Sequence, residues 1–402
     1  MTPLIVMAPH PDDELLGAGG LMARAVADAR PIAVIVITDG SASDPSVARD
    51  QQRIQRRAET TAGLAKLLGM APPILFLDYP DGSFLARDVP IGPGSTLATF
   101  LAYFPAARLL VTDPADGHPD HKAAFGLAAR MVAQGLVDQL DVMPISQRID
   151  GAFAAQGYTT HSLGHHGEAK AAALACHHSQ IDTQSGFALS KTVLADFTAV
   201  EYTRFVHDRH CAESEAVPRG HFDAMFQKSP DPWGYDSVAY EADRFRRTIA
   251  ALEGKHFNSA LELGCANGAL TAQLINCCNT LVATDTAQAA LDAARERLDG
   301  HDGVDFRLGN LPDDLPDGRY DLIVLSDMLY YLGLQGVVRL MVLLQTRAEP
   351  VCRIVMTNYL GETDCALSGE MAAEIALAHA PGWATVHASR TERLRIDVLE
   401  RI

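Results

Sequence analysis

Residues 4–16 read LIVMAPHPDDELL, and this stretch decides how the first half of the chain folds. Its apolar start belongs to a run over residues 3–8 that has the length and composition of a buried β-strand. Polar residues follow at once, with His10, Asp12, Asp13 and Glu14 packed into five positions. Because a helical pattern comes next, these side chains are expected at the carboxyl edge of a parallel sheet, where open α/β folds bind ligands.

The same alternation of apolar runs and helical patterns continues along the chain. In the first half, further strands are predicted at 32–38, 74–77 and 108–112, and helices at 14–29, 47–68 and 121–132. In the second half, strands are predicted at 260–263, 280–284, 322–326 and 353–357, followed by a hairpin of 384–389 and 394–399. The pattern predicts two Rossmann-like α/β domains, each a mostly parallel sheet flanked by helices, the second with a C-terminal antiparallel hairpin.

The boundary between the two domains is predicted near residue 211. Residues 211–219 read CAESEAVPR, a polar and acidic stretch that contains a proline. We therefore expect a first domain over residues 1–210, a linker over 211–220 and a second domain over 221–402.

Composition excludes several classes of protein. The chain has 402 residues, 48% hydrophobic and 21% charged, which is typical of a folded globular protein. Its net charge of −17 disfavours binding to nucleic acid or to anionic membranes. No apolar run approaches the roughly 20 residues of a transmembrane helix, and the N-terminus lacks the basic region of a signal peptide. Seven cysteines, an odd number, do not indicate a disulfide framework, so we expect a cytoplasmic protein with free thiols.

A second polar cluster follows the predicted strand at 108–112. Residues 117–121 read GHPDH and place His118, Asp120 and His121 at the same sheet edge as the first cluster. Either motif alone is explained equally well as a helix cap. Two such clusters at neighbouring strand ends instead favour a catalytic zinc site, in which two imidazoles and one carboxylate leave a coordination position open.

At these residues the first half resembles the PIG-L, or LmbE-like, zinc de-N-acetylases over about residues 1–200. The motifs that carry the resemblance are HPDDE at 10–14, HPDH at 118–121, Arg-x-x-Glu at 56–59, Asp-Gly at 81–82 and His-x-Ser-Gln at 177–180.

The resemblance implies a role for each matched residue. Zinc, or another divalent metal, would be bound by His10, Asp13 and His121. Asp12 would be the general base, and His118 would stabilise charge on the tetrahedral intermediate. The implied substrate is a small N-acetylated sugar or glycoconjugate, contacted by Arg56, Asp81 and His177.

In the second half, residues 261–268 read LELGCANG between a predicted strand and a predicted helix. Gly264 and Gly268 thus fall at a turn where a backbone can approach a ligand closely. Asp285 ends the next predicted strand about twenty residues later, a position that suits hydrogen bonds to ribose hydroxyls. The third glycine of GxGxxG is absent, which weakens the reading of this turn as a nicotinamide site.

This half resembles the class I S-adenosylmethionine-dependent methyltransferases, in particular the N-methyltransferase NodS, over about residues 220–402. The resemblance rests on DPW at 231–233, ELGCANG at 262–268 and SDMLYYL at 326–332. It implies a site for S-adenosylmethionine made of Trp233, Tyr240, Glu262, Gly264, Gly268, Asp285 and Asn310. Asn310 departs from the acidic residue that is commoner at the adenine position. Asp327 is either a helix cap or the group that accepts a proton from the methyl acceptor.

The order of the two domains suggests a reaction sequence. Deacetylation yields an amine, and an N-methyltransferase consumes one, so we expect a bifunctional enzyme that converts an N-acetyl amino sugar into an N-methylamino sugar. Two alternatives remain open at this point: O-methylation of another hydroxyl on the same glycoside, or a regulatory protein that senses S-adenosylmethionine and has an inactive deacetylase domain.

Overall fold

The structure is a computed structural model that describes residues 1–181, 189–209 and 216–402. It divides into two compact units, Met1–Cys211 and Ala212–Ile402, and each is described separately. The predicted linker at 211–220 lies partly outside the described residues.

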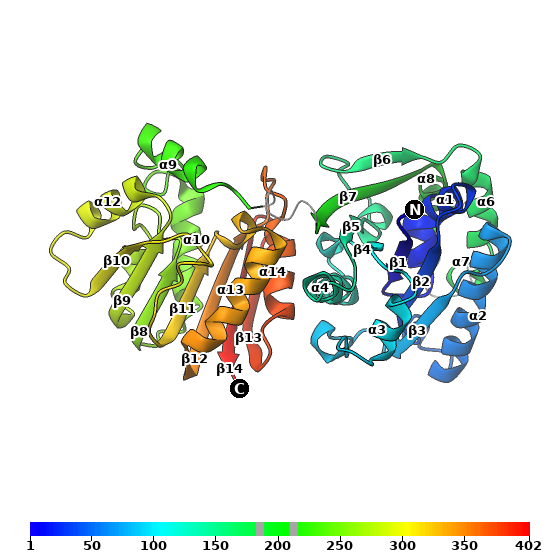
Figure 1. The fold of residues 1–402 in the computed structure, drawn as a ribbon, viewed down its shortest axis with the longest axis horizontal. Helices are drawn as coiled ribbons and strands as arrows, with labels where there is room; N and C mark the ends of the chain where they lie inside the picture. The colour runs from blue at the N-terminus through cyan, green and yellow to red at the C-terminus, as the bar shows by residue number, and fades with distance from the viewer. Residues whose placement is uncertain (182–188, 210–215) are drawn as a thin grey trace. The chain divides into compact units, whose positions relative to one another are not determined.

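The first unit is built on a mostly parallel sheet (Figure 1). Its described strands are β1 (Leu4–Ala8), β2 (Ile32–Thr38), β3 (Ile74–Tyr79), β4 (Arg108–Thr112), β5 (Gln139–Met143), β6 (Thr159–Ser162) and β7 (Val200–Asp208). They lie in the order β3-β2-β1-β4-β5-β7-β6, with β1 to β5 parallel and β7 antiparallel to both β5 and β6. The sequence pattern predicted the parallel strands β1 to β4 but not this antiparallel edge.

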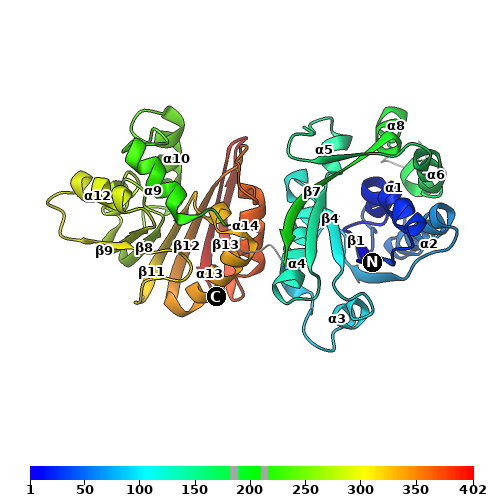
Figure 2. The same cartoon turned by 45° about the horizontal axis from the view of Figure 1, so that its top comes forward.

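Helices cover both faces of this sheet, and Figure 2 shows α4 on one face and α1, α2 and α6 on the other. The helices and turns of the unit are α1 (Asp13–Ala27), α2 (Arg49–Leu68), η1 (Ala86–Asp88), α3 (Thr96–Leu101), η2 (Pro114–Asp116), α4 (Pro119–Ala133), α5 (Ser146–Ile149), α6 (His166–Leu174), α7 (His178–Ile181) and α8 (Lys191–Ala199). Because both faces are covered, β1 and β2 are buried along their whole length, as their unbroken apolar sequence requires.

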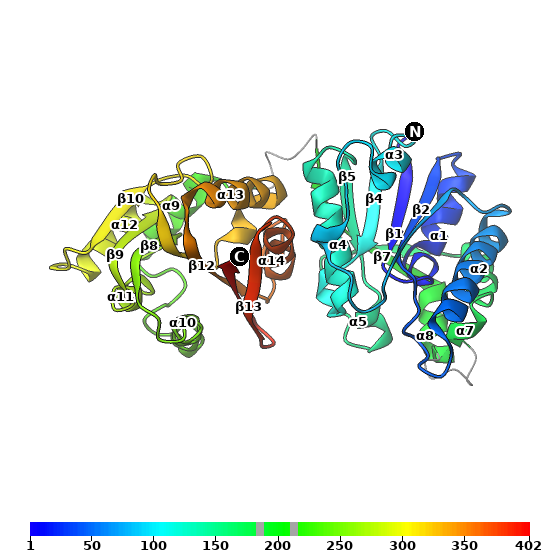
Figure 3. The ribbon, with the colours of Figure 1, turned by 90° about the horizontal axis from the view of Figure 1, so that it is seen from below.

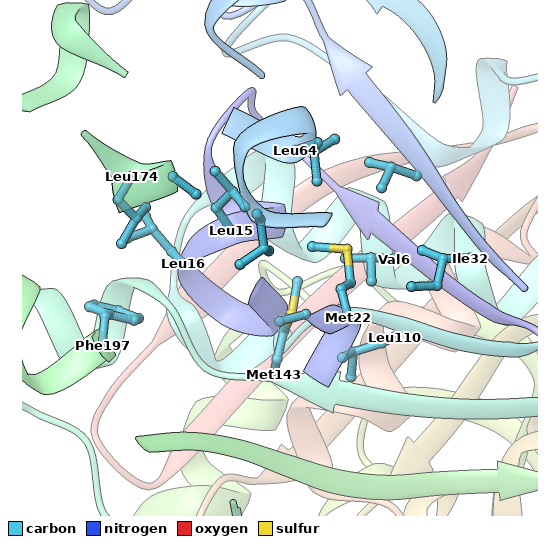
Figure 4. Close-up of a cluster of buried hydrophobic side chains, with 14 of the residues drawn as sticks. Val6, Leu15, Leu16, Met22, Ile32, Leu64, Leu110, Met143, Leu174 and Phe197 are labelled. Atoms are coloured by element: carbon cyan, nitrogen blue, oxygen red, sulfur yellow. The ribbon is translucent and has the colours of Figure 1, made fainter. Parts of the chain in front are cut away.

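One part of the core of the first unit lies between the sheet and the layer of α1, α2 and α6. Figure 4 shows Leu15, Leu16 and Met22 of α1 gathered with Val6 of β1 and other side chains of one buried cluster. Helix α1 approaches the sheet closely: a Cβ atom added at Gly17 would lie 2.3 Å from Met143 Sδ. Tight packing therefore fixes the helix that begins at the HPDDE motif.

A buried ion pair ties α1 to α6 and β7. Lys170 and Glu201 are fully buried, and Lys170 Nζ lies 2.6 Å from Glu201 Oε1. The Glu201 carboxylate also accepts hydrogen bonds from the backbone N–H groups of Gly20 and Leu21, and the Lys170 ammonium donates to the carbonyl of Leu16. Both charges are thus satisfied by the middle of helix α1, which offsets the cost of burying them.

The second unit repeats the same strand order. Its described strands are β8 (Phe257–Leu263), β9 (Cys278–Asp285), β10 (Val304–Leu308), β11 (Tyr320–Ser326), β12 (Ala348–Tyr359), β13 (Trp383–Arg390) and β14 (Leu394–Arg401). They lie in the order β10-β9-β8-β11-β12-β14-β13, with β8 to β12 parallel and β14 antiparallel to β12 and β13. This confirms the two mostly parallel sheets and the C-terminal hairpin that the sequence predicts.

Helices again pack on both faces, and Figure 3 shows α13 on one face of the second sheet and α10 and α11 on the other. The helices and turns of this unit are α9 (Arg219–Lys228), α10 (Ala239–Ala250), α11 (Thr271–Leu274), α12 (Gln288–Arg297), η4 (Leu329–Tyr331), α13 (Gly333–Arg347) and α14 (Gly369–Ala378). Across the described ranges of both units, no helix combines the length and the apolar character needed to cross a membrane.

Candidate active sites at the carboxyl edges of the two sheets

The HPDDE and HPDH motifs meet because β1 and β4 are parallel neighbours. Each motif follows its strand directly, so both lie at the carboxyl edge of the first sheet. The rings of His10, His118 and His121 pack together with centroids 4.7 to 5.4 Å apart. Each ring can offer one nitrogen such that the three nitrogen atoms lie within 4.8 Å of one another.

The Asp13 carboxylate lies between two of these rings. Its Oδ2 atom is 3.2 Å from His10 Nδ1 and 3.4 Å from His121 Nε2. Burial alone would raise the pKa of Asp13, but the two histidines lower it well below its usual range. Burial likewise lowers the pKa of His121, yet Asp13 and Asp116 raise it to about 9. Two nitrogens and one carboxylate oxygen that converge in this way fit the donor set of a hydrolytic zinc site.

The outer nitrogens of His10 and His121 both face carboxylates. His121 Nδ1 is 3.0 Å from Asp116 Oδ2, and His10 Nε2 is 3.2 Å from Asp120 Oδ2 and 3.3 Å from Asp81 Oδ1. A neutral imidazole that donates its N–H outward presents its lone pair inward. Both rings are therefore oriented as metal ligands, in the arrangement by which carboxylates orient metal-bound histidines in other proteins.

His118 has the opposite arrangement. It is the N-cap residue of α4, and its Nδ1 atom accepts a hydrogen bond of 3.2 Å from the backbone N–H of Asp120. Burial, together with the charges of His10 and His121, lowers the pKa of His118. The neutral ring must then carry its proton on Nε2, so that His118 is suited to donate a hydrogen bond rather than to bind a metal.

Asp12 does not cap helix α1, contrary to the helix-cap explanation of its motif. Although it occupies the N-cap position, its side chain makes no capping hydrogen bond, and its Oδ2 atom lies 3.1 Å from Arg56 Nη2. Burial raises the pKa of Asp12 to about 6, against the effect of Arg56. Its backbone φ of 145° is rare for a residue other than glycine. Such strain costs on the order of 1–3 kcal/mol and is concentrated at functional sites.

The three predicted substrate-binding residues lie in different surroundings. Arg56 is buried, and its guanidinium donates to the carbonyl oxygens of Pro11 and Gly40, so it holds the loop that carries Asp12. Asp81 touches His10, as described above. His177 is buried in the interior with its Nε2 atom 3.9 Å from Glu14, and burial lowers its pKa to about 3. The structure thus brings Arg56 and Asp81 to the cluster of histidines, whereas His177 faces Glu14.

Sequence reasoning missed Asp116 as a member of this site. Asp116 is buried, and besides His121 it accepts hydrogen bonds from the backbone N–H groups of Ile145 and Gln147. Its place directly before GHPDH was the available signal, but its backbone partners after β5, at the start of α5, are not visible in the local sequence.

In the second unit, the glycine turn follows β8 at the carboxyl edge of the sheet. Gly264 and Gly268 have φ values of 81° and 77°, which side chains rarely allow. A Cβ atom at Gly268 would also lie 3.0 Å from the Cβ atom of Ala294, so helix α12 leaves no space for one. Both glycines are therefore required by the turn itself.

Two acidic residues support this turn. The two oxygens of Asp285 accept hydrogen bonds of 2.9 Å from the backbone N–H groups of Ala266 and Ala287, and burial raises its pKa. Glu262 is buried within β8 and accepts a hydrogen bond from the Thr271 hydroxyl, and burial raises its pKa to about 7. In this structure, both carboxylates stabilise the loop around the predicted cofactor site.

The other predicted cofactor residues are spread along the same edge. Trp233 stacks on Tyr235 and belongs to an apolar cluster with Ala266, so it lies beside the glycine turn. Tyr240, on α10, donates a hydrogen bond to the carbonyl of Arg393. Asn310 follows β10 and is exposed.

Asp327 at the end of β11 has both carboxylate oxygens engaged. Oδ1 accepts a hydrogen bond of 2.5 Å from the backbone N–H of Tyr359, and Oδ2 lies 3.0 Å from Arg244 Nη1. Burial raises the pKa of Asp327 to about 6, although Arg244 acts in the opposite direction. Sequence analysis missed Arg244, which comes from α10 and also pairs with Glu241.

Comparisons with known families match each half of the chain separately. A family profile described as GlcNAc-PI de-N-acetylase, PIG-L, matches residues 5–132, and one described as nodulation protein S, NodS, matches residues 225–351.

Two curated relatives agree with this division. Nodulation protein S of Rhizobium tropici is 32% identical over 104 residues, which are 26% of this chain and 44% of the relative. A 1D-myo-inositol 2-acetamido-2-deoxy-alpha-D-glucopyranoside deacetylase of Tsukamurella paurometabola is 31% identical over 143 residues, 33% of this chain and 41% of the relative. The chain thus spans less than half the length of each of these relatives.

Solved structures also resemble the two halves. NodS from Bradyrhizobium japonicum WM9 with S-adenosyl-L-homocysteine has a TM-score of 0.40 and 19% identity, and the match covers 45% of this chain and 98% of NodS. The N,N'-diacetylchitobiose deacetylase from Pyrococcus horikoshii has a TM-score of 0.42 and 18% identity, with 51% and 84% of the two chains covered.

On the two family profiles, the chain carries a PIG-L deacetylase domain in its N-terminal half and a NodS methyltransferase domain in its C-terminal half.

Proposed function

We propose that the chain is a bifunctional enzyme that hydrolyses the acetamide of an N-acetyl amino sugar, or of its glycoconjugate, and then N-methylates the resulting amine. Two similar proteins are named for deacetylation of N-acetylated sugars, and another is named an N-methyltransferase. Joining the two activities in one chain places a reaction that releases an amine beside one that consumes it.

The main support for deacetylase activity is that the three histidines of the first site are oriented for different roles. His10 and His121 turn one ring nitrogen toward Asp13 and the other toward a carboxylate, whereas His118 accepts a backbone N–H at Nδ1 and is left with an N–H at Nε2. His10, Asp13 and His121 would therefore hold zinc or another divalent metal. When bound, such a metal lowers the pKa of water to about 7 and polarises a carbonyl oxygen.

The chain's own residues account for the proton transfers. Asp12 lies next to the proposed ligands and accepts the proton of the attacking water, and Arg56 holds its carboxylate in place. His118 donates its Nε2–H to the oxygen on which negative charge develops. The protonated Asp12 then gives its proton to the leaving nitrogen, and the products are acetate and a primary amine.

The methyltransferase half uses the glycine turn and the end of β11. S-adenosylmethionine supplies an electrophilic methyl group on a sulfonium. Gly264 and Gly268 let the backbone approach this cofactor, with Trp233 beside the turn and Asp285 fixing its shape. Asp327 is held by Arg244 and accepts the proton that the amine releases. An amide nitrogen is a poor nucleophile, so deacetylation must come first.

The order of reactions is tested with a panel of N-acetylhexosaminides, with and without S-adenosylmethionine, read by mass spectrometry. We expect Asp12→Asn to add no methyl group to the acetylated substrate but to methylate the synthetic free amine. Conversely, Asp285→Ala should accumulate the deacetylated, unmethylated product, because the glycine turn loses the hydrogen bond that Ala266 donates to this carboxylate. Methylation of the intact acetamide by Asp12→Asn would contradict N-methylation and support the O-methyl alternative, and NMR would then locate the methyl group.

A further inference from the structure

Asp120 contacts two histidines of the first site through two different groups. Its carboxylate Oδ2 atom lies 3.2 Å from His10 Nε2, and its backbone N–H donates a hydrogen bond of 3.2 Å to His118 Nδ1. The residue is fully buried in the first turn of helix α4. One residue thus offers an acceptor to one ring and a donor to the other.

These two contacts have opposite chemical consequences. An acceptor on His10 Nε2 keeps the proton there and frees the Nδ1 lone pair, which faces Asp13. A donor on His118 Nδ1 occupies the lone pair of that atom and keeps the proton on Nε2. The group of Asp120 that contacts each ring determines which ring nitrogen carries the proton. His10 is therefore left with a lone pair for a metal, and His118 with an N–H to donate.

The surroundings hold Asp120 in this orientation. Its Oδ2 atom also accepts a hydrogen bond of 2.8 Å from the backbone N–H of Gly82. Asp81 adds a second carboxylate at 3.3 Å from His10 Nε2. Because His10, Asp81 and Asp120 converge within 4.8 Å, they could themselves be taken for a second cation site. A neutral imidazole has only one free lone pair, however, so His10 cannot bind a metal on both sides.

We propose that Asp120 is the positioning residue that assigns the two histidines their roles: its carboxylate makes His10 a metal ligand, and its backbone N–H makes His118 a hydrogen-bond donor. The proposal rests on the proposed deacetylase function of this site. The side chain of Asp120 thus acts on His10, and its backbone N–H acts on His118. Substitution of the side chain removes only the effect on His10.

The test compares three variants of the full chain. Asp120→Ala removes the acceptor but keeps the backbone N–H. Asp120→Asn keeps an oxygen acceptor for His10 at the position of Oδ2. Its amide NH₂ can replace Oδ1, which has no hydrogen-bond partner among the described residues. Asp141→Ala is the matched control, since Asp141 is a buried aspartate of the same unit that pairs with Arg108, in β4.

Affinity for Zn²⁺ alone is measured by competition with a chelator, after thermal unfolding has shown that each variant is folded. We expect Asp120→Ala to bind zinc roughly tenfold to a hundredfold more weakly, the usual effect of losing a residue that orients a ligand. Asp120→Asn should restore most of this loss, and Asp141→Ala should bind as the wild type does. Removing Asp81 together with the Asp120 carboxylate should weaken binding further.

A second readout follows the rings themselves, by ¹⁵N NMR of the histidine side chains in the zinc-loaded protein. We expect Asp120→Ala to change the His10 Nε2–H signal and to leave His118 in its Nε2–H form. Zinc affinity equal to wild type in Asp120→Ala, or an equal change at His10 and His118, would overturn the proposal. A wild-type protein that binds zinc but deacetylates no sugar would instead overturn the proposed function, so the two failures are distinct.

Discussion

The two halves of the molecule use one strand order for two kinds of chemistry. Numbered within each unit, both sheets run 3-2-1-4-5-7-6, and both sites follow the first and fourth strands. In the first unit those loops carry acids and imidazoles, whereas in the second they carry glycines and Asp327, which pairs with Arg244 of α10. The fold thus determines where a ligand binds, and a few residues in the loops determine which reaction it undergoes.

The two sites also differ in what a carboxylate does. In the first unit, Asp13 lies between two histidines and Asp12 pairs with Arg56, and both are candidates for chemistry. In the second unit, Asp285 has one oxygen bound by the glycine turn, at the Ala266 N–H, and the other bound by the backbone N–H of Ala287. The edge of the first sheet therefore depends on charge, whereas the glycine turn of the second depends on backbone shape.

The largest expected effect is that of Asp12→Asn on deacetylation. Loss of the general base should lower kcat by about 10² to 10⁴-fold, while zinc binding and methylation of the free amine stay unchanged. Acetate release and methyl transfer are measured on the same preparation. A near wild-type kcat for deacetylation would show that another residue is the base.

The matching test of the second edge is Gly268→Ala. This residue has a φ of 77°, and the added Cβ atom would meet Ala294 at 3.0 Å, so the turn must shift. A penalty of about 1–2 kcal/mol for the left-handed backbone corresponds to roughly tenfold weaker binding of S-adenosylmethionine, measured by calorimetry.

Gly300→Ala is the control for this prediction. Gly300 has a similar φ of 85° but open space around its Cβ position, so the substitution carries the same backbone penalty away from the turn. Cofactor affinity should then stay at the wild-type value. An equal loss in both variants would mean that general destabilisation, and not the shape of the turn, weakens binding.

A smaller effect is expected in the pH dependence of deacetylation. Arg56 lowers the pKa of Asp12, which burial raises to about 6. The base must be deprotonated, so activity falls as the pH drops through this pKa. Arg56→Gln removes the cation, raises the pKa and should move the acid limb of kcat/KM to higher pH.

Activity of the Arg56→Gln variant should therefore be reduced more at pH 6 than at pH 8. The methylation profile serves as the internal control and should not move. An unshifted acid limb would show that Arg56 acts on the loop at Pro11 and Gly40 without affecting the charge of Asp12.

The smallest effect is expected when the two halves are separated. Because the described chain divides into Met1–Cys211 and Ala212–Ile402, each half should bury its own core and fold alone. Residues 1–210 should express as a metal-loaded deacetylase with nearly unchanged kcat. Insolubility of both halves would point instead to a large shared interface.

Sequence alone predicted the features that are local in the chain. The strands before HPDDE, GHPDH and ELGCANG are marked by apolar runs, and their order places the motifs at the carboxyl edges. What it could not predict depends on contacts between distant residues. The antiparallel strand β7 buries Glu201 and Thr203 and exposes Phe205, so its polarity does not indicate its buried face. Arg244 reaches Asp327 from a helix more than 80 positions earlier.

The same limit explains why Asp12 was open to two interpretations. A carboxylate directly before a helix is usually a cap. Asp12 instead pairs with Arg56, which lies 44 positions later in the sequence. The partner of a buried charge is chosen by tertiary packing, which a local pattern does not record.

The Lys170–Glu201 pair has a consequence for how the first site is made during synthesis. Helix α1, which begins at Asp13, leaves the ribosome before Glu201, which binds its middle and lies near the end of the unit. A nascent chain that stops before β7 would contain every proposed zinc ligand. It would still lack Glu201, which holds the helix that carries Asp13. We therefore expect the proposed deacetylase site to assemble, and to bind its metal, only after the last strand of its own unit has been translated.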